Sequence, residues 1–206
     1  MDELLRDFVT IFVVVDPIGT LPVFSHATRG APVETQRAVA LRAVAVGGGV
    51  LLFFVVFGQL LLEGIGISLA SFQIAGGLVL FLFALTMIFG EGKPAAEIDG
   101  APPDPMETAV FPLAMPSIAS PGAMLAVVVL TDNARYTLSE QAVTVALLAG
   151  VLAVTLGALL AAAPLNRRLG AGGASVISRV MGMILAAVAV DTVLRGLAAV
   201  GLPITL

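Results

Sequence analysis

Several residue types on which common functional sites depend are absent or nearly absent from this chain. Its 206 residues include no cysteine, no tryptophan, one tyrosine and one histidine. The lack of cysteine excludes disulfides, thiolate metal sites and cysteine nucleophiles, and the single His26 falls in a predicted connection, outside any ligand cluster. Only 12% of the residues are charged, and the basic ones form no patch of the kind that binds nucleic acids. We therefore expect no metal, no cofactor and no nucleic-acid partner.

What the chain has in excess is apolar residues. Hydrophobic side chains make up 59% of the sequence and the mean hydropathy is +1.08, whereas in soluble domains about 25% of the residues are charged. A helix needs roughly 20 residues to cross the hydrocarbon core of a bilayer, and six nearly uncharged windows are close to that length or longer. We predict an all-α membrane protein whose six transmembrane helices cover residues 8–25, 39–62, 65–89, 108–131, 141–165 and 178–200.

The basic residues predict how these helices are oriented. When the connections alternate between the two sides of the membrane, seven of the ten Lys and Arg residues fall on one side and three on the other. Connections rich in Lys and Arg stay in the cytoplasm. We therefore expect a multi-pass protein of the cell inner membrane with both termini outside, which is the periplasm in a Gram-negative host.

The chain divides into two halves of three predicted helices each. Because three is an odd number, the second half enters the membrane from the face opposite to the first, which gives two inverted repeats. Pro17 and Pro121 lie 104 positions apart, and residues 73–76 resemble residues 179–182 at an offset of 106. The predicted units are a first repeat at 1–90, a cytoplasmic linker rich in Gly, Pro and charge at 91–107, and a second repeat at 108–206.

Each half has a proline-glycine interruption inside its first apolar window, Asp16-Pro17-Ile18-Gly19 and Ser120-Pro121-Gly122. Proline suits the first position of a helix because its missing amide has no partner there, and Asp or Ser directly before it can cap the helix. We predict that helices 1 and 4 are broken at the membrane midplane and restart at these two prolines. Pro22 and Pro116, in the same windows, either take part in the breaks or only bend their helices.

A helix that restarts inside the membrane exposes backbone amides that no carbonyl of the same helix can reach. Broken helices at corresponding places of two inverted repeats are where many transporters bind their substrates. The positive ends of two helix dipoles would attract a carboxylate to such a place. The amides predicted to bind substrate belong to Ile18, Gly19, Thr20, Gly122 and Ala123.

Four polar residues within the predicted helices have two interpretations each. Asp16 either faces a substrate ammonium or a coupling proton, or only caps its own helix, and Ser120 either contacts substrate or only caps the next one. Gln73, in the middle of the third helix, is a substrate contact or an interhelical hydrogen bond. Asp191, the other acidic residue at membrane depth, either pairs with Arg195 four residues on or takes part in a proton relay.

Together these motifs resemble a known family. The segments 15–24, 74–77, 112–116, 121–123 and 179–182 are similar to those of the MarC family of six-helix inner-membrane proteins, whose SnatA-like members transport neutral amino acids. The resemblance covers the whole chain and implies secondary transport of glycine, alanine or serine by alternating access, coupled to protons or sodium ions. Two positions depart from the family pattern: Gln73, where arginine is common, and Asp191, where a neutral polar residue is commoner.

The sequence leaves two other classes of function to weigh. A channel or exporter of other small solutes, including drugs, would have a wide aromatic-lined pocket, which the low aromatic content disfavours. An intramembrane enzyme needs a nucleophile and a base, which only Asp16 and Asp191 could supply by meeting as a pair, so no enzymatic activity is expected. The expected partners are a small amino acid and the lipid bilayer, and a homo-oligomer is compatible with the sequence.

Overall fold

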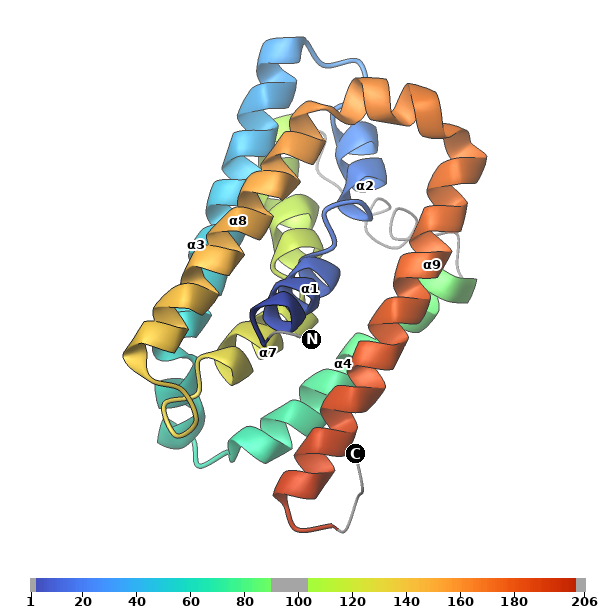
Figure 1. Ribbon diagram of the computed structural model, residues 1–206. Helices are drawn as coiled ribbons and strands as arrows, with labels where there is room; N and C mark the ends of the chain where they lie inside the picture. Colours follow the sequence, from blue (N-terminus) through green and yellow to red (C-terminus); the bar gives the residue numbers. More distant parts are fainter. Residues whose placement is uncertain (1–2, 90–103, 203–206) are drawn as a thin grey trace.

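A computed structural model describes residues 3–89 and 104–202 of the chain, and these residues form helices and no strands (Figure 1). In chain order the elements are α1 (Glu3–Val15), α2 (Thr20–Ala27), α3 (Val33–Gly64), α4 (Leu69–Phe89), α6 (Pro105–Thr108), the π-helix η1 (Ala109–Ile118), α7 (Pro121–Leu130), α8 (Leu138–Leu160) and α9 (Ala162–Ala199). Inside η1 the backbone of Phe111 and Met115 is extended rather than helical, and each of these residues precedes a proline. The all-α prediction is confirmed.

Five helical stretches are long and apolar enough to cross a membrane, and a sixth is formed if a bent pair of helices counts as one span. The bent pair is Met106–Ile118 with Pro121–Leu130, whose axes differ by 55°, and the first span, Leu4–Ala27, includes both α1 and α2. The chain is thus a multi-pass membrane protein, and each of its spans corresponds to one of the six windows predicted from hydropathy.

The short, interrupted helices lie inside the molecule, and the long helices surround them. In Figure 1, α1, α2 and α7 run through the middle, with α3 and α8 on one side and α4 and α9 on the other. Of the apolar window within the span that contains α1 and α2, 61% is buried inside the protein, against 28–33% of the corresponding windows in α3, α4, α8 and α9. Non-helical backbone at membrane depth must be covered by protein, because lipid offers it no hydrogen bonds. The long helices provide this cover.

Helices α4 and α9 form the most extensive helix pair and run antiparallel (Figure 1). Two glycines let their backbones approach closely. A Cβ added at Gly77 would lie 3.0 Å from the carbonyl oxygen of Ala189, and one added at Gly182 would lie 3.1 Å from that of Ala84. Small residues allow this kind of contact between membrane helices. Nη1 of Arg179, in α9, also donates a hydrogen bond of 2.8 Å to the carbonyl of Ile88 near the end of α4.

Helix α9 is longer than predicted. The sequence was expected to form a connection between residues 165 and 178, but α9 begins at Ala162, directly after α8. In Figure 1 its first part lies across one end of the molecule and the rest runs along α4; the apolar span begins only at Ser175. Hydropathy marks where a helix becomes apolar enough to enter a membrane, not where helical hydrogen bonding starts, so the prediction missed this segment.

Two further expectations concern connections. His26 lies in the last turn of α2 and not in a loop, and it is exposed. The predicted linker at 91–107 falls mostly on residues outside the described part of the chain; its final residues enter α6. The division into units 1–90, 91–107 and 108–206 therefore stays a prediction.

Candidate functional site

The first interruption is a closed turn built around Asp16. Helix α1 ends at Val15, and Asp16 takes a left-handed backbone conformation with φ of 51°, which residues other than glycine adopt rarely and Asp or Asn most readily. Its Oδ1 accepts a hydrogen bond of 2.9 Å from the amide of Gly19, and its carbonyl accepts one of 3.2 Å from the amide of Thr20. Asp16 is only 1% exposed. A Cβ at Gly19 would overlap its carboxylate, so only glycine fits there.

The prediction that a helix restarts at Pro17 is therefore wrong. Helix α2 begins at Thr20, three residues later. The left-handed Asp16 turns the chain before Pro17, and its carboxylate and carbonyl bind the amides that follow. Pro22 lies in the first turn of α2, where its missing amide has no partner within the helix and costs nothing.

The second interruption has a different geometry. Ser120 caps α7, which begins at Pro121 as predicted: Oγ of Ser120 accepts a hydrogen bond of 3.1 Å from the amide of Ala123. The same hydroxyl donates a hydrogen bond of 3.0 Å to the carbonyl of Val14, in the last turn of α1. Ser120 is 1% exposed. One buried side chain thus joins the beginning of α7 to the end of α1.

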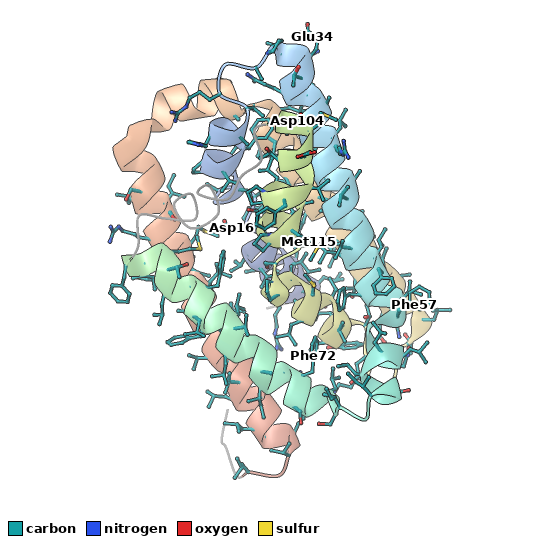
Figure 2. The ribbon with its side chains drawn as sticks, turned by 180° about the vertical axis from the view of Figure 1, so that it is seen from behind. Asp16, Glu34, Phe57, Phe72, Asp104 and Met115 are labelled. Atoms are coloured by element: carbon teal, nitrogen blue, oxygen red, sulfur yellow. The ribbon has the colours of Figure 1, made fainter. Side chains whose placement is uncertain are left out.

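Three of the five amides predicted to be free already have partners. The amides of Gly19 and Thr20 bind Asp16, and the amide of Ala123 binds Ser120. Each interruption thus satisfies these backbone donors within its own turn, as buried polar groups generally must. These hydrogen bonds do not involve the amides of Ile18 and Gly122, so for these two residues the binding of a substrate carboxylate stays a prediction. Figure 2 shows Asp16 and Met115, one from each interrupted span, near mid-height in the molecule.

A pocket of about 300 Å³ lies between α1, α4, α7 and α9. Three residues predicted from the sequence to have a functional role line it: Gln73 from α4, Gly122 from α7 and Asp191 from α9. The other predicted substrate-binding residues, Asp16, Ile18, Gly19, Thr20, Ser120 and Ala123, are not part of its lining. The structure therefore brings only part of the predicted site together, and it does so along α4 and α9 rather than between the starts of α2 and α7.

Four residues of α1 at helical spacing form one wall of this pocket: Arg6, Asp7, Thr10 and Val14. At 1.5 Å per residue, the eight steps from Arg6 to Val14 give a wall about 12 Å long, which is less than half of a hydrocarbon core of about 30 Å. Leu80, which also lines the pocket, is 2% exposed, and its side chain packs against Gly122. The pocket thus extends along α1 from the charged residues Arg6 and Asp7 to the apolar Val14.

The opposite wall belongs to α9 and has an ion pair. Nε of Arg195 lies 2.7 Å from Oδ2 of Asp191, and its Nη2 lies 3.2 Å from Oδ1. This confirms the predicted intrahelical pair. The two side chains are 42% and 50% exposed, so water screens the pair and it contributes little to stability. Both residues line the pocket.

Comparison with known proteins identifies the family. A model of the family described as MarC family integral membrane protein matches residues 1–200. The chain belongs to the MarC family. A UPF0056 membrane protein of Methanocaldococcus jannaschii is 35% identical over 199 residues, which cover 92% of this chain and 93% of the relative. A UPF0056 membrane protein of Archaeoglobus fulgidus is 33% identical over 193 residues, which cover 93% of this chain and 90% of the relative.

A bacterial relative of this MarC protein is the UPF0056 inner membrane protein YhgN of Escherichia coli, which is 28% identical over 203 residues and 96% of this chain. These matches span nearly the whole length of each protein. No solved structure matches the chain significantly.

The pocket of this MarC protein has both signs of charge on facing walls. Arg6 and Asp7 lie on α1, and Asp191 and Arg195 lie on α9. Sequence reasoning missed the contribution of α1, because Arg6 and Asp7 precede the apolar window and look like a water-exposed flank. The available signal was the helical spacing of Asp7, Thr10 and Val14, which places these three residues on one face of the helix. Such a pocket suits a small solute that itself has a positive and a negative group.

Proposed function

We propose that this protein is a secondary transporter of small neutral amino acids, of the size of glycine, alanine or serine, across the cell inner membrane. The observation that carries the proposal is the pocket between α1, α4, α7 and α9, where Gln73 and Gly122 meet charged residues of both signs. An amino acid at neutral pH is a zwitterion, so its carboxylate fits an arginine and its ammonium fits an aspartate. The resemblance of the motifs to SnatA-like transporters gives the same substrate class.

The size of the pocket supports a small substrate. A volume of about 300 Å³ is at the lower end of the range of roughly 300–1,000 Å³ for small-molecule sites. Its lining includes no aromatic residue among the described side chains. These features favour an aliphatic zwitterion over a bulky aromatic drug, the main alternative among exported solutes.

Reciprocal contacts between α4 and α9 support the inverted repeats that alternating access requires. Gly77 of α4 approaches Ala189 and Val193 of α9, and Gly182 of α9 approaches Ala84 and Ile88 of α4. The residues of the two contacts correspond in pairs that lie 105 positions apart in the sequence: Gly77 with Gly182, Ala84 with Ala189, and Ile88 with Val193. Two antiparallel helices that exchange equivalent contacts in this way are related by an approximate two-fold axis, as in transporters built from inverted repeats.

In this proposal the two halves move relative to each other, and the pocket opens alternately to the two sides. The hydrogen bond from Ser120 to Val14 and the packing of Leu80 against Gly122 join the two halves. The distribution of Lys and Arg in the sequence favours a location of both termini outside. Asp16 and Asp191 are candidates for binding a coupling ion, because both are acidic residues within apolar spans.

The test is uptake by purified protein in liposomes. We expect uptake of radiolabelled glycine and alanine that saturates, exchanges with unlabelled substrate and responds to an imposed proton or sodium gradient. Gln73→Ala, which removes a pocket side chain that is 3% exposed, should raise the half-saturating concentration. Asn133→Ala, outside the pocket in the exposed α7–α8 connection, is the control. Uptake that does not saturate would indicate a channel, and the absence of both binding and uptake would rule out this substrate class.

A further inference from the structure

A buried hydroxyl outside the pocket has no structural explanation. Ser178, in α9, is 8% exposed, and its Oγ has no hydrogen-bond partner among the residues that the structure describes. A buried polar group without a partner is rare in proteins and destabilises the state in which it occurs. The conformation described by the structure therefore leaves the hydrogen-bonding capacity of Ser178 unused.

The position of Ser178 becomes informative when α9 is compared with α4. Four buried residues of α4 have buried counterparts in α9, each 105 positions further along the chain. They are Gln73 and Ser178, Gly77 and Gly182, Leu80 and Leu185, and Ala84 and Ala189. The same separation relates the reciprocal backbone contacts of Gly77 and Gly182. Ser178 thus occupies in α9 the place that Gln73 occupies in α4.

This equivalence is informative about function because Gln73 and Leu80 both line the pocket. We propose that Ser178 is the polar residue of a second access site for the same substrate, which opens at the opposite end when the two halves exchange conformations. The inference rests on the proposed transport function. In that state the hydroxyl of Ser178 binds a small amino acid, as the amide of Gln73 does in the pocket.

The proposal accounts for the burial of Ser178 without a partner. In an inverted-repeat transporter one end of the substrate pathway is closed while the other is open. Ser178 is not part of the pocket lining, and it lies next to Arg179, which binds the end of α4 through the carbonyl of Ile88. Opening this end would release that bond and expose the hydroxyl to substrate and water. The cost of the unsatisfied group in one state then favours the change to the other.

The natural lack of cysteine permits a direct test by thiol labelling. Ser178→Cys, Thr192→Cys and Thr155→Cys are each labelled with a membrane-impermeant maleimide, in intact cells and in inverted membrane vesicles. Thr192 lines the pocket, and its hydroxyl bonds to Val188 within α9. Thr155, the control, is fully buried in α8 and bonds to Val151 in the same way.

We expect Thr192→Cys to react from one side of the membrane and Ser178→Cys to react from the other, with Thr155→Cys unreactive from both. Glycine at saturating concentration should change the two labelling rates. Labelling of Ser178→Cys from the same side as Thr192→Cys would overturn the inference, as would no labelling from either side while Thr192→Cys reacts. Because labelling needs no transport assay, the two failures can be told apart: absence of amino-acid transport by the wild-type protein contradicts the proposed function, whereas the wrong labelling pattern in a protein that does transport contradicts only the inference about Ser178.

A second variant, Ser178→Ala, tests the inference independently of the cysteine variants, in case Ser178→Cys folds poorly. Ser178→Ala removes the unsatisfied hydroxyl, so it should raise thermal stability, and it should lower the rate of glycine transport by about fivefold to tenfold because one substrate hydrogen bond is lost. A purely structural serine would give the same gain in stability with unchanged transport, and this result would overturn the inference.

Discussion

The two interruptions look alike in sequence but differ in what they do in the structure. In the first, Asp16 turns the chain and its side chain binds the amide of Gly19 in the same turn. In the second, Ser120 caps its own helix and also binds the carbonyl of Val14 from the first half. Only the second borders the pocket, through Gly122. Similar motifs in two halves of a protein therefore need not have similar roles.

The difference follows from the chemistry of the two capping side chains. The carboxylate oxygen of Asp16 that binds Gly19 is an acceptor, whereas a hydroxyl both donates and accepts. Ser120 can thus satisfy an amide of its own helix and a carbonyl of another, while Asp16 accepts from the amide of the turn that follows it. We conclude that the first interruption fixes a local turn and that the second connects the two halves.

The largest expected effect comes from filling the first turn. Gly19→Ala should destabilise the protein by about 3 kcal/mol or more, because the new methyl group overlaps the carboxylate of Asp16 in a fully packed turn. The matched variant Gly122→Ala meets only the flexible end of the Leu80 side chain, so it should lose less stability but weaken glycine binding. Thermal unfolding in detergent and binding assays measure both effects. Equal losses of stability would contradict the comparison.

Removing the connection between the halves should have the next largest effect. Ser120→Ala deletes a helix cap and leaves the buried carbonyl of Val14 without this donor, which together should cost about 1–3 kcal/mol. Thr155→Val is the control, because the hydroxyl of Thr155 bonds only within its own helix and its loss should cost little. Thermal unfolding of both variants in detergent is the measurement. If Ser120→Ala were as stable as the control, the hydrogen bond to Val14 would have no structural importance.

A smaller effect on stability is expected when the charge of the first turn is removed. In Asp16→Asn the amide oxygen can still accept a hydrogen bond from Gly19, and asparagine tolerates the left-handed backbone, so stability should change by less than about 1 kcal/mol. Transport should nevertheless fall strongly, since an acidic residue within an apolar span is expected to be functional. Gradient-driven uptake and thermal unfolding are measured together. Unchanged uptake would mean that Asp16 only caps its turn.

The smallest effect on stability should come from the ion pair of the pocket wall. Asp191→Asn breaks an exposed pair with Arg195, which contributes only about 0.3–0.5 kcal/mol. Arg135→Gln breaks a longer pair with Asp132, 3.4 Å from Nε to Oδ2, in the α7–α8 connection outside the pocket. Both variants should have nearly wild-type melting temperatures, and only Asp191→Asn should weaken glycine binding. If both variants bound glycine equally well, Asp191 would have no role in the pocket.

Local rules predicted some elements of the structure well. A serine before a proline at the start of an apolar run predicts a capped helix, and α7 begins at Pro121 for this reason. The spacing of Asp191 and Arg195 predicts their pair, since residues four apart lie on one face of a helix. Hydropathy predicted the membrane spans, because a helix that crosses the hydrocarbon core needs a long run of apolar residues.

The errors arose where a residue's role depends on distant parts of the chain or on an uncommon backbone conformation. The left-handed Asp16 cannot be read from a pattern that normally starts a helix, so α2 was expected three residues too early. Arg6 and Asp7 looked like a flank, because only the tertiary structure brings α1 opposite α9. Ser178 gave no signal at all, since its interest comes from its burial and its equivalence to Gln73.

The central claim is that the pocket between α1, α4, α7 and α9 binds a zwitterion. The most direct measurement is competition against radiolabelled glycine bound to the purified protein, with unlabelled alanine, acetate and methylammonium as competitors. The proposed function predicts that alanine displaces glycine and that acetate and methylammonium, which each have only one of the two charges, do so at least tenfold less well. Absence of glycine binding, or equal displacement by the singly charged compounds, would contradict it.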